Sequence, residues 1–194
     1  MNTAVDVMTE QLPRRHLITV EEYHRMDELG LLAPDARVEL IEGEFIDMPP
    51  IGRDHAAIVD ELNFVFVQAI GRRAIVRIQG PVQLSNISEP QPDLMLLRPR
   101  ADRYREEQAG GTDTLLVVEV SASSFRYDRT TKLALYARHK VPEVWIVEVE
   151  GNRLHCFRAL QGMQYTDVSS ALEPKVMPVP GLEGVSVDLS CLFS

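Results

Sequence analysis

Two acidic residues lie in stretches of sequence that predict buried strands. Glu119 lies inside the apolar run 115–120, and Asp93 opens the apolar stretch 94–97 directly after Pro92. A buried carboxylate persists only when it is paired, hydrogen-bonded, protonated or bound to a metal ion. Carboxylates at the ends of neighbouring strands also offer the oxygen ligands that Mg²⁺ and Mn²⁺ prefer. Both residues are therefore candidate metal ligands.

Each of these carboxylates also has a structural interpretation. Asp93 could cap a strand edge or a turn, and Glu119 could form a buried salt bridge with an arginine or lysine. Lys132 is a candidate partner for this salt bridge. Replacing one member of a buried Glu119–Lys132 ion pair would lower the free energy of unfolding by roughly 3–5 kcal/mol. A metal site predicts the opposite, since removing one carboxylate from a repulsive cluster would stabilise the metal-free protein.

Lys132 is the third candidate, in a predicted helix over residues 129–140. It lies one helical turn before Tyr136 and shares its face. A lysine beside two metal-binding carboxylates would hold a nucleophilic water or stabilise charge that develops on a phosphate. The alternative is a surface lysine whose ammonium stays in water.

Three upstream residues could join the same site. Glu39 and Glu42 belong to a predicted hairpin over residues 37–48, and His55 begins a predicted helix over 54–70. Strand alternation turns Glu39 away from its apolar neighbours, which is equally compatible with a solvent-facing position. His55 could contact a ligand or simply occupy the first helical turn. The spacing does not decide which of the three takes part.

The order of elements predicts a mixed α+β protein with a central sheet and at least two substantial helices. A capping box at Thr19 and Glu22 begins the first helix, which should end at Gly30. Strands are expected over 74–78, 82–84, 92–97, 114–120, 143–149 and 153–158, with a surface loop over 98–113 and short strands and loops after residue 158.

Composition and charge limit the class of protein. The 194 residues are 45% hydrophobic and 25% charged, as in globular proteins, and we expect a flexible tail over 1–16 and one domain over 17–194. No apolar run spans a membrane, and two unclustered cysteines favour a reduced, cytoplasmic protein. The net charge of −9 argues against a broad phosphate-binding surface, and less strongly against a nuclease, whose carboxylate cluster itself adds negative charge.

Five blocks of the sequence, taken together, resemble a known family. They are RVELIEGEFIDMPP (37–50), DHAAIVDEL (54–62), QPDLMLL (91–97), LLVVEVSASS (115–124) and DRTTKLALYARHKVPEVWIVE (128–148). Their order and spacing are similar to the Uma-two family of restriction-endonuclease-like proteins, over roughly residues 15–160. Any one block alone would be weak, but the succession of blocks is specific.

The resemblance implies a PD-(D/E)xK nuclease fold, an α/β/α arrangement in which helices flank a mixed central sheet. It implies that Asp93, Glu119 and the backbone carbonyl of Val120 hold Mg²⁺ or Mn²⁺, and that Glu39 completes the site by holding a second metal ion or a water. The chain departs from the superfamily pattern at Ser121, where a lysine is expected. The resemblance implies that the lysine has moved to the following helix, which points to Lys132.

The expected activity is hydrolysis of DNA by a Mg²⁺-dependent endonuclease. The alternative is a nuclease-fold module without catalysis that acts in protein or nucleic-acid binding, which the acidic charge and Ser121 favour. Arg126, Arg129 and His55 could contact phosphates. We expect a homodimer, because cutting both strands often needs two active sites, with residues 163–190 supplying the interface. The form of DNA and any sequence specificity stay open.

Overall fold

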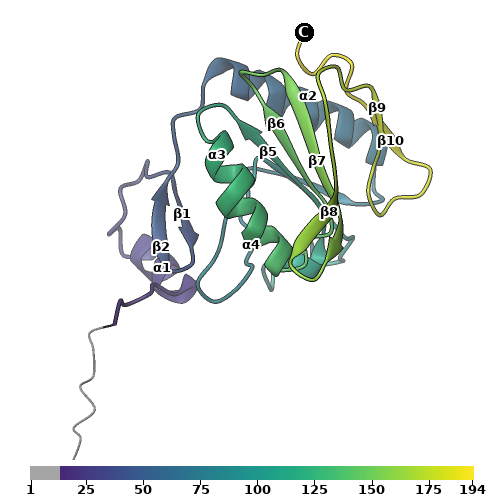
Figure 1. Ribbon diagram of the computed structural model, residues 1–194. Coiled ribbons are helices and arrows are strands. Elements are labelled where there is room, and N and C mark those ends of the chain that lie inside the picture. The colour runs from purple at the N-terminus through teal and green to yellow at the C-terminus, as the bar shows by residue number, and fades with distance from the viewer. Residues whose placement is uncertain (1–13) are drawn as a thin grey trace, which may run out of the picture.

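A six-stranded mixed sheet forms the centre of the computed structural model, which describes residues 14–194 (Figure 1). Its strands, in spatial order, are β3 (Ile75–Ile78), β4 (Leu94–Leu97), β5 (Thr114–Ser121), β6 (Val144–Glu148), β7 (Arg153–Gln161) and β8 (Gln164–Ala171). Neighbouring strands are antiparallel except for β5 and β6, which run parallel. This arrangement confirms the predicted mixed α+β class.

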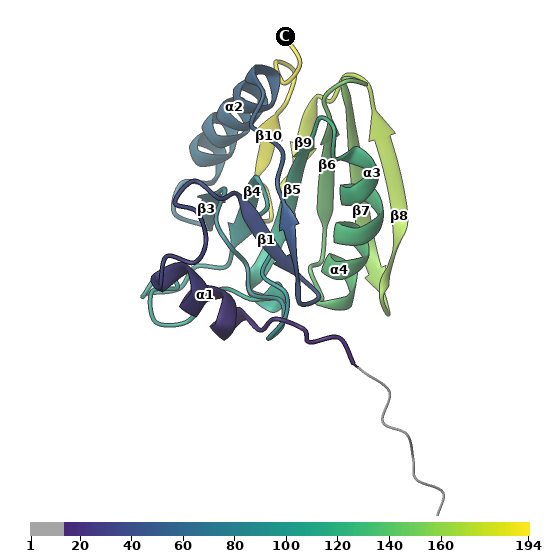
Figure 2. The same cartoon turned by 90° about the vertical axis from the view of Figure 1, so that its left-hand side faces the viewer.

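Helices cover both faces of the sheet (Figure 2). The long helix α2 (Arg53–Ile70) lies on one face. A second helical segment lies on the other and consists of α3 (Phe125–Tyr127), a π-helical turn (Asp128–Lys132) and α4 (Leu133–Arg138). The predicted α/β/α layering is therefore present. The small β9 (Val176–Pro178) and β10 (Ser186–Asp188) pair with each other near α2.

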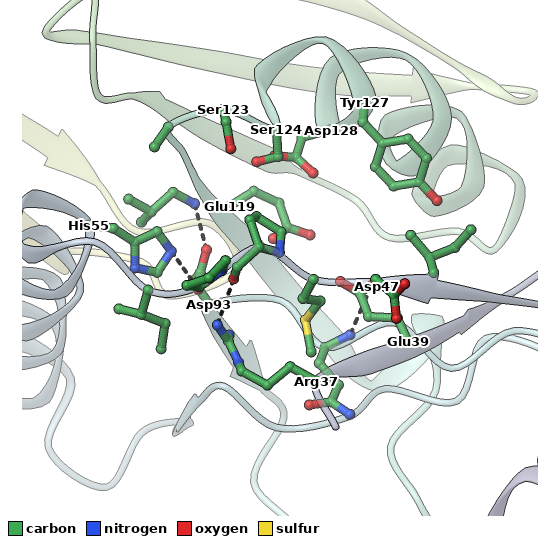
Figure 3. Close-up of a pocket in the computed structure, with 18 of the residues that line it drawn as sticks. Arg37, Glu39, Asp47, His55, Asp93, Glu119, Ser123, Ser124, Tyr127 and Asp128 are labelled. Atoms are coloured by element: carbon green, nitrogen blue, oxygen red, sulfur yellow. Dashed lines mark hydrogen bonds and ion pairs between the residues drawn. The ribbon is translucent and has the colours of Figure 1, made fainter. Parts of the chain in front are cut away.

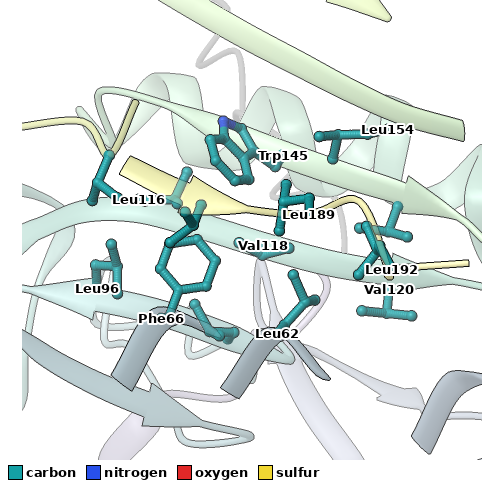
Figure 4. Close-up of a cluster of buried hydrophobic side chains, with 14 of the residues drawn as sticks. Leu62, Phe66, Leu96, Leu116, Val118, Val120, Trp145, Leu154, Leu189 and Leu192 are labelled. Atoms are coloured by element: carbon teal, nitrogen blue, oxygen red, sulfur yellow. The ribbon is translucent and has the colours of Figure 1, made fainter. Parts of the chain in front are cut away.

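The side chains of β5 alternate between two hydrophobic clusters, and this alternation places the acidic residue of the strand. Leu116, Val118 and Val120 pack in the larger cluster with Phe66 of α2 and Trp145 of β6 (Figure 4). The intervening residues point to the opposite face, where Val117 packs against Tyr136 of α4. Glu119 has the same parity as Val117, so strand geometry directs it toward the second helical segment.

The N-terminal elements form a separate unit beside the sheet. Helix α1 (Val20–Glu28) begins with the predicted capping box, and β1 (Val38–Ile41) pairs with β2 (Glu44–Asp47) as the predicted hairpin. Two backbone hydrogen bonds attach this hairpin to the segment before β4, from Glu89 N to Leu40 O and from Gly43 N to Ile87 O, each 2.7 Å long. Gly43 has φ +80° and lies against Leu17, where a Cβ atom would clash. The turn therefore requires glycine.

Several predicted elements were wrong in detail. Residues 82–84 form no strand, because their N–H groups bond to loop carbonyls of Pro90, Ala109 and Ser88. The helix predicted over 129–140 begins earlier, at Phe125, and contains a π-helical turn. The loop 98–113 is not entirely a surface loop, since the side chains of Tyr104 and Ala109 are buried in the second hydrophobic cluster. The region after residue 158 contains the eight-residue strand β8.

The predicted tail over residues 1–16 lies mostly outside the described residues, and the division into a tail and one domain over 17–194 stays a prediction. Within residues 14–194, no helix combines the length and the apolar character needed to cross a membrane.

Helix α2 offers a matched pair of substitutions that tests the core. Leu62 is completely buried, whereas Phe64 two residues later is 61% exposed. We expect Leu62→Ala to lower the free energy of unfolding by about 2–5 kcal/mol, because it leaves a cavity beneath the sheet. Phe64→Ala should change that free energy by about 0.5 kcal/mol or less. Urea unfolding monitored by Trp145 fluorescence measures both, and equal effects would contradict the packing described.

Candidate metal centre

The four predicted site residues line one pocket, which lies where β5 ends and the neighbouring strand β4 begins. Asp93 comes from the start of β4, Glu119 from β5, Lys132 from the π-helical turn and Glu39 from the hairpin. Figure 3 shows these acidic side chains beside His55, which lies in the first turn of α2. Because they come from separate elements, only the folded chain brings them together.

Glu119 is the most enclosed member of the group. Its Oε1 atom accepts a 2.5 Å hydrogen bond from the Tyr136 hydroxyl and lies 3.1 Å from Nζ of Lys132. The predicted ion pair with Lys132 is therefore present. Both contacts use Oε1, and none of the hydrogen bonds or ion pairs among residues 14–194 involves Oε2. One oxygen of this carboxylate is fixed and the other remains available to a ligand.

Lys132 also binds the carboxylate of the hairpin. Its Nζ atom lies 2.9 Å from Oε1 of Glu39, and both side chains are about 95% buried, with 5% and 4% of their surfaces exposed. The backbone N–H of Gln91 donates to the other oxygen of Glu39 at 3.4 Å. The interpretations of Lys132 as a surface lysine and of Glu39 as a solvent-facing strand residue are both wrong.

Asp93 is held from three directions. Its Oδ2 atom accepts a 2.8 Å hydrogen bond from Val120 N, and Oδ1 lies 3.1 Å from Nε2 of His55 and 3.3 Å from the side-chain amide of Gln79. It therefore caps the edge of a strand, as the structural interpretation proposed, while it lines the pocket.

His55 joins the group, whereas Glu42 pairs with Arg138 at 2.6 Å and does not line the pocket.

Burial and crowding perturb the protonation of these groups. Burial raises the pKa of Glu119 to about 8, and the charges of Asp128, Asp93 and Glu39 add to the effect, which Lys132 opposes. Burial likewise raises the pKa of Glu39. For Asp93 burial acts in the same direction, but the His55 and Val120 contacts outweigh it and hold the pKa below its usual value. Burial would lower the pKa of Lys132, yet the surrounding carboxylates raise it.

Sequence reasoning missed Asp128 and did not assign a role to Tyr136. The buried Asp128 lines the pocket and accepts hydrogen bonds from Ser121 Oγ at 2.7 Å and Ser124 Oγ at 2.6 Å. Asp128, Lys132 and Tyr136 recur at steps of four, which was the available signal. In an α-helix such residues drift by about 40° per step. The wider π-helical turn at Asp128–Lys132 offsets this drift, and such turns are frequent at functional sites.

The arrangement of the pocket suits a divalent cation. Five carboxylates line it, together with the cations of Lys132 and Arg37 and the imidazole of His55. Within residues 14–194, no three His, Cys, Asp or Glu side chains are gathered as a ready-made metal cage. Asp93 and Glu119 supply two oxygen ligands, and a backbone carbonyl is an ordinary third ligand for such ions.

The carbonyl of Val120 points to the correct side of β5 for this role. Val117 N bonds to Glu143 O and Val149 N bonds to Ser121 O, so the odd-numbered residues of β5 direct their backbone groups toward β6. Val120 therefore directs its own groups the other way, and its N–H meets Asp93 there. The residues thus fit the metal that was predicted, although Arg126 and Arg129, expected near phosphates, do not line the pocket.

Comparison with known proteins is consistent with this geometry. The Uma2 family model, described as "Putative restriction endonuclease", matches residues 20–190. No curated protein matches the chain. Among solved structures, one described as "a putative nuclease belonging to DUF820", from Anabaena variabilis ATCC 29413, is similar with a TM-score of 0.67. It is 20% identical, and the match covers 91% of this chain and 97% of that chain. At this identity the likeness shows the fold, and it confirms the predicted architecture.

The raised pKa of Glu119 predicts a pH dependence of stability. Its ordinary pKa is 4.5 and its folded pKa is about 8, so the folded chain binds more protons than the unfolded chain between these values. This contribution to stability is complete below about pH 4.5 and is lost as the pH rises to about 8. In metal-free buffer, Glu119→Gln should therefore lose stability less steeply over this range than the wild type. Urea unfolding at several pH values measures the slopes.

The exposed Glu106 provides the control for this experiment. We expect Glu106→Gln to keep the slope of the wild type. A Glu119→Gln variant with that same slope would show that Glu119 is ionised in the folded chain throughout the range, which would contradict its raised pKa.

Proposed function

The chain belongs to the Uma2 family, and we propose that it is a metal-dependent endonuclease that hydrolyses phosphodiester bonds of DNA. The observation that carries the proposal is the meeting of Asp93, Glu119, Lys132 and Glu39 in one pocket. Three acidic groups and a buried lysine at the end of a central strand are costly to maintain, since each charge must be compensated. Such an arrangement is typical of functional sites.

Asp93, Glu119 and the carbonyl of Val120 would hold Mg²⁺ or Mn²⁺. A bound divalent ion supplies Lewis acidity to a phosphate and makes water a stronger acid. The protein holds these ligands in fixed orientations before any ion binds. His55 and Val120 N fix the carboxylate of Asp93, and Tyr136 fixes one oxygen of Glu119.

Lys132 would take the role of the lysine that Ser121 replaces. An ammonium group has three N–H donors, of which Glu39 and Glu119 occupy two. The third is free to orient a water or to stabilise negative charge on a phosphate oxygen. Glu39 holds the ammonium from the hairpin, and it is the residue that would receive a second metal ion or a water.

A second candidate function is a nuclease-fold module that binds protein or nucleic acid without catalysis. Ser121 at the usual lysine position favours it, as does the pairing of Lys132 with two carboxylates. The two functions differ in whether the pocket binds a metal ion and whether metal-dependent cleavage follows.

We also propose that the working form is a homodimer, because a duplex offers two strands to cut. Strand β8 is the last strand of the sheet, and Val168 within it and Leu172 directly after it are more than half exposed, as is Val176 of β9. These residues lie within the segment 163–190 that the sequence indicated as an interface.

Metal binding tests the centre directly. We expect wild-type protein in metal-stripped buffer to bind Mn²⁺ in a calorimeter, and we expect Asp93→Asn and Glu119→Gln each to weaken binding by about 10-fold or more, because each removes a charged ligand. Asp60→Asn, an exposed aspartate of α2, should bind like the wild type. Absence of binding in the wild type, even with DNA present, would favour the module without catalysis.

Cleavage tests the chemistry. With Mg²⁺ or Mn²⁺ present, the wild type should cut DNA, supplied in parallel as supercoiled plasmid, linear duplex and single strand. Asp93→Asn should reduce the rate by about 100-fold or more, whereas Asp60→Asn should not change it. Chelation of the metal should abolish cutting. Equal rates for Asp93→Asn and the wild type would indicate a contaminating nuclease and remove the support for catalysis.

A further inference from the structure

Arg37 is a fixed cation at the rim of the candidate metal centre. It immediately precedes β1, and its carbonyl accepts a 2.7 Å hydrogen bond from Met48 N at the far end of the hairpin. Its guanidinium Nη1 donates to Pro49 O, also at 2.7 Å. In Figure 3 the side chain extends beneath the carboxylates, toward the end of the pocket that holds Asp93. The hairpin therefore positions this charge.

The positive charge of Arg37 has no acidic partner. Among residues 14–194, no carboxylate lies within 4.0 Å of its guanidinium, although acidic residues surround the pocket. Lys132, by contrast, is paired with Glu39 and Glu119, and His55 is paired with Asp93. A guanidinium carries five donors, and only one of those of Arg37 is used within this part of the chain. Its remaining donors are available to an anion.

Arg37 also lies where two hollows meet. A second pocket, lined by Tyr23 and Gln79, shares Arg37, Gln91 and Asp93 with the metal centre. The two hollows therefore adjoin at Arg37 and Asp93. The second hollow is lined by the neutral amide side chains of Gln79 and Gln91, and Asp93 is the one acidic residue in its lining. A strand with negative charges meets less repulsion there than in the metal centre.

We propose that Arg37 binds a backbone phosphate of the DNA strand adjacent to the bond that is cut, and that the second hollow receives that part of the strand. The inference rests on the proposed function. A planar guanidinium with free donors matches two phosphate oxygens at once, which a lysine does not. Phosphate contacts of this kind fix the position of a strand without reading its sequence.

The proposal also accounts for how an acidic protein admits a polyanion. The net charge is −9, and the metal centre itself is rich in carboxylates. Arg126 and Arg129 lie outside the pocket, so Arg37 is the unpaired cation that a phosphate would meet at its rim. Binding should therefore depend on this one contact more than it would on a basic surface.

The experiment measures DNA affinity by fluorescence anisotropy over a range of NaCl concentrations, with a fluorescein-labelled duplex and the matching single strand. Ca²⁺ replaces Mg²⁺ to prevent cutting during the measurement. We expect Arg37→Gln to weaken binding by about 10-fold at low salt. It should also reduce the slope of log K against log salt by about 0.9 on duplex, or about 0.7 on single strand, the value for one lost phosphate contact.

Two further variants make the test specific. Arg129→Gln, which removes an exposed arginine outside the pocket, should leave affinity and slope unchanged. Arg37→Lys should retain the slope while it binds more weakly, because the charge remains and the two-oxygen contact is lost. Mn²⁺ affinity, measured by calorimetry without DNA, should stay within about 2-fold of the wild type in Arg37→Gln, since no metal ligand is changed.

The outcomes separate this proposal from the proposed function. Wild type that binds Mn²⁺ and DNA, with Arg37→Gln indistinguishable from Arg129→Gln, overturns the role of Arg37 alone. Loss of Mn²⁺ binding together with DNA binding in Arg37→Gln also overturns it, because Arg37 would then act by shaping the pocket. Wild type that binds neither Mn²⁺ nor DNA overturns the proposed function, and the role of Arg37 with it.

Discussion

The ammonium group of Lys132 is the charge on which the arrangement of the pocket depends. It lies between Glu39 of the hairpin and Glu119 of the sheet, and it is itself part of the helical segment that covers β5. A single buried cation thus connects three elements that have no continuous hydrogen-bonded ladder between them. Its removal would take from Glu39 and Glu119 the cation that both contact, and breaking a buried ion pair by removing one partner is strongly destabilising.

The contacts around Lys132 determine which carboxylate oxygens accept hydrogen bonds from the protein and which can still bind a ligand. Tyr136 and Lys132 both contact the same oxygen of Glu119. Asp93 is contacted by the backbone N–H of Val120 in the sheet and by His55 in α2. The π-helical turn makes this convergence possible, because it keeps residues four apart on the face toward β5. The same packing that buries the charges also determines which atoms remain for a ligand.

The sequence predicted those parts of the site that local patterns encode. Glu119 was identified by its apolar neighbours, and Asp93 by the proline before a buried strand. The burial of Glu39 and the partnership of His55 with Asp93 depend on contacts between segments far apart in the chain, so no local pattern reveals them. Asp128 was missed because the predicted helix began at Arg129, whereas the helical segment begins at Phe125 and includes Asp128. The strand expected over 82–84 failed because loop carbonyls satisfy its backbone N–H groups.

Asp93, Glu119 and the Val120 carbonyl are proposed to form one metal centre. Crystals of the wild-type chain soaked in Mn²⁺ and measured for anomalous scattering would locate the ion directly. The proposed centre predicts a single strong peak within coordination distance of both carboxylates and of the Val120 carbonyl, with Tyr136 still bonded to Glu119. A peak elsewhere, or none at saturating Mn²⁺ with both carboxylates in their present hydrogen bonds, would contradict it.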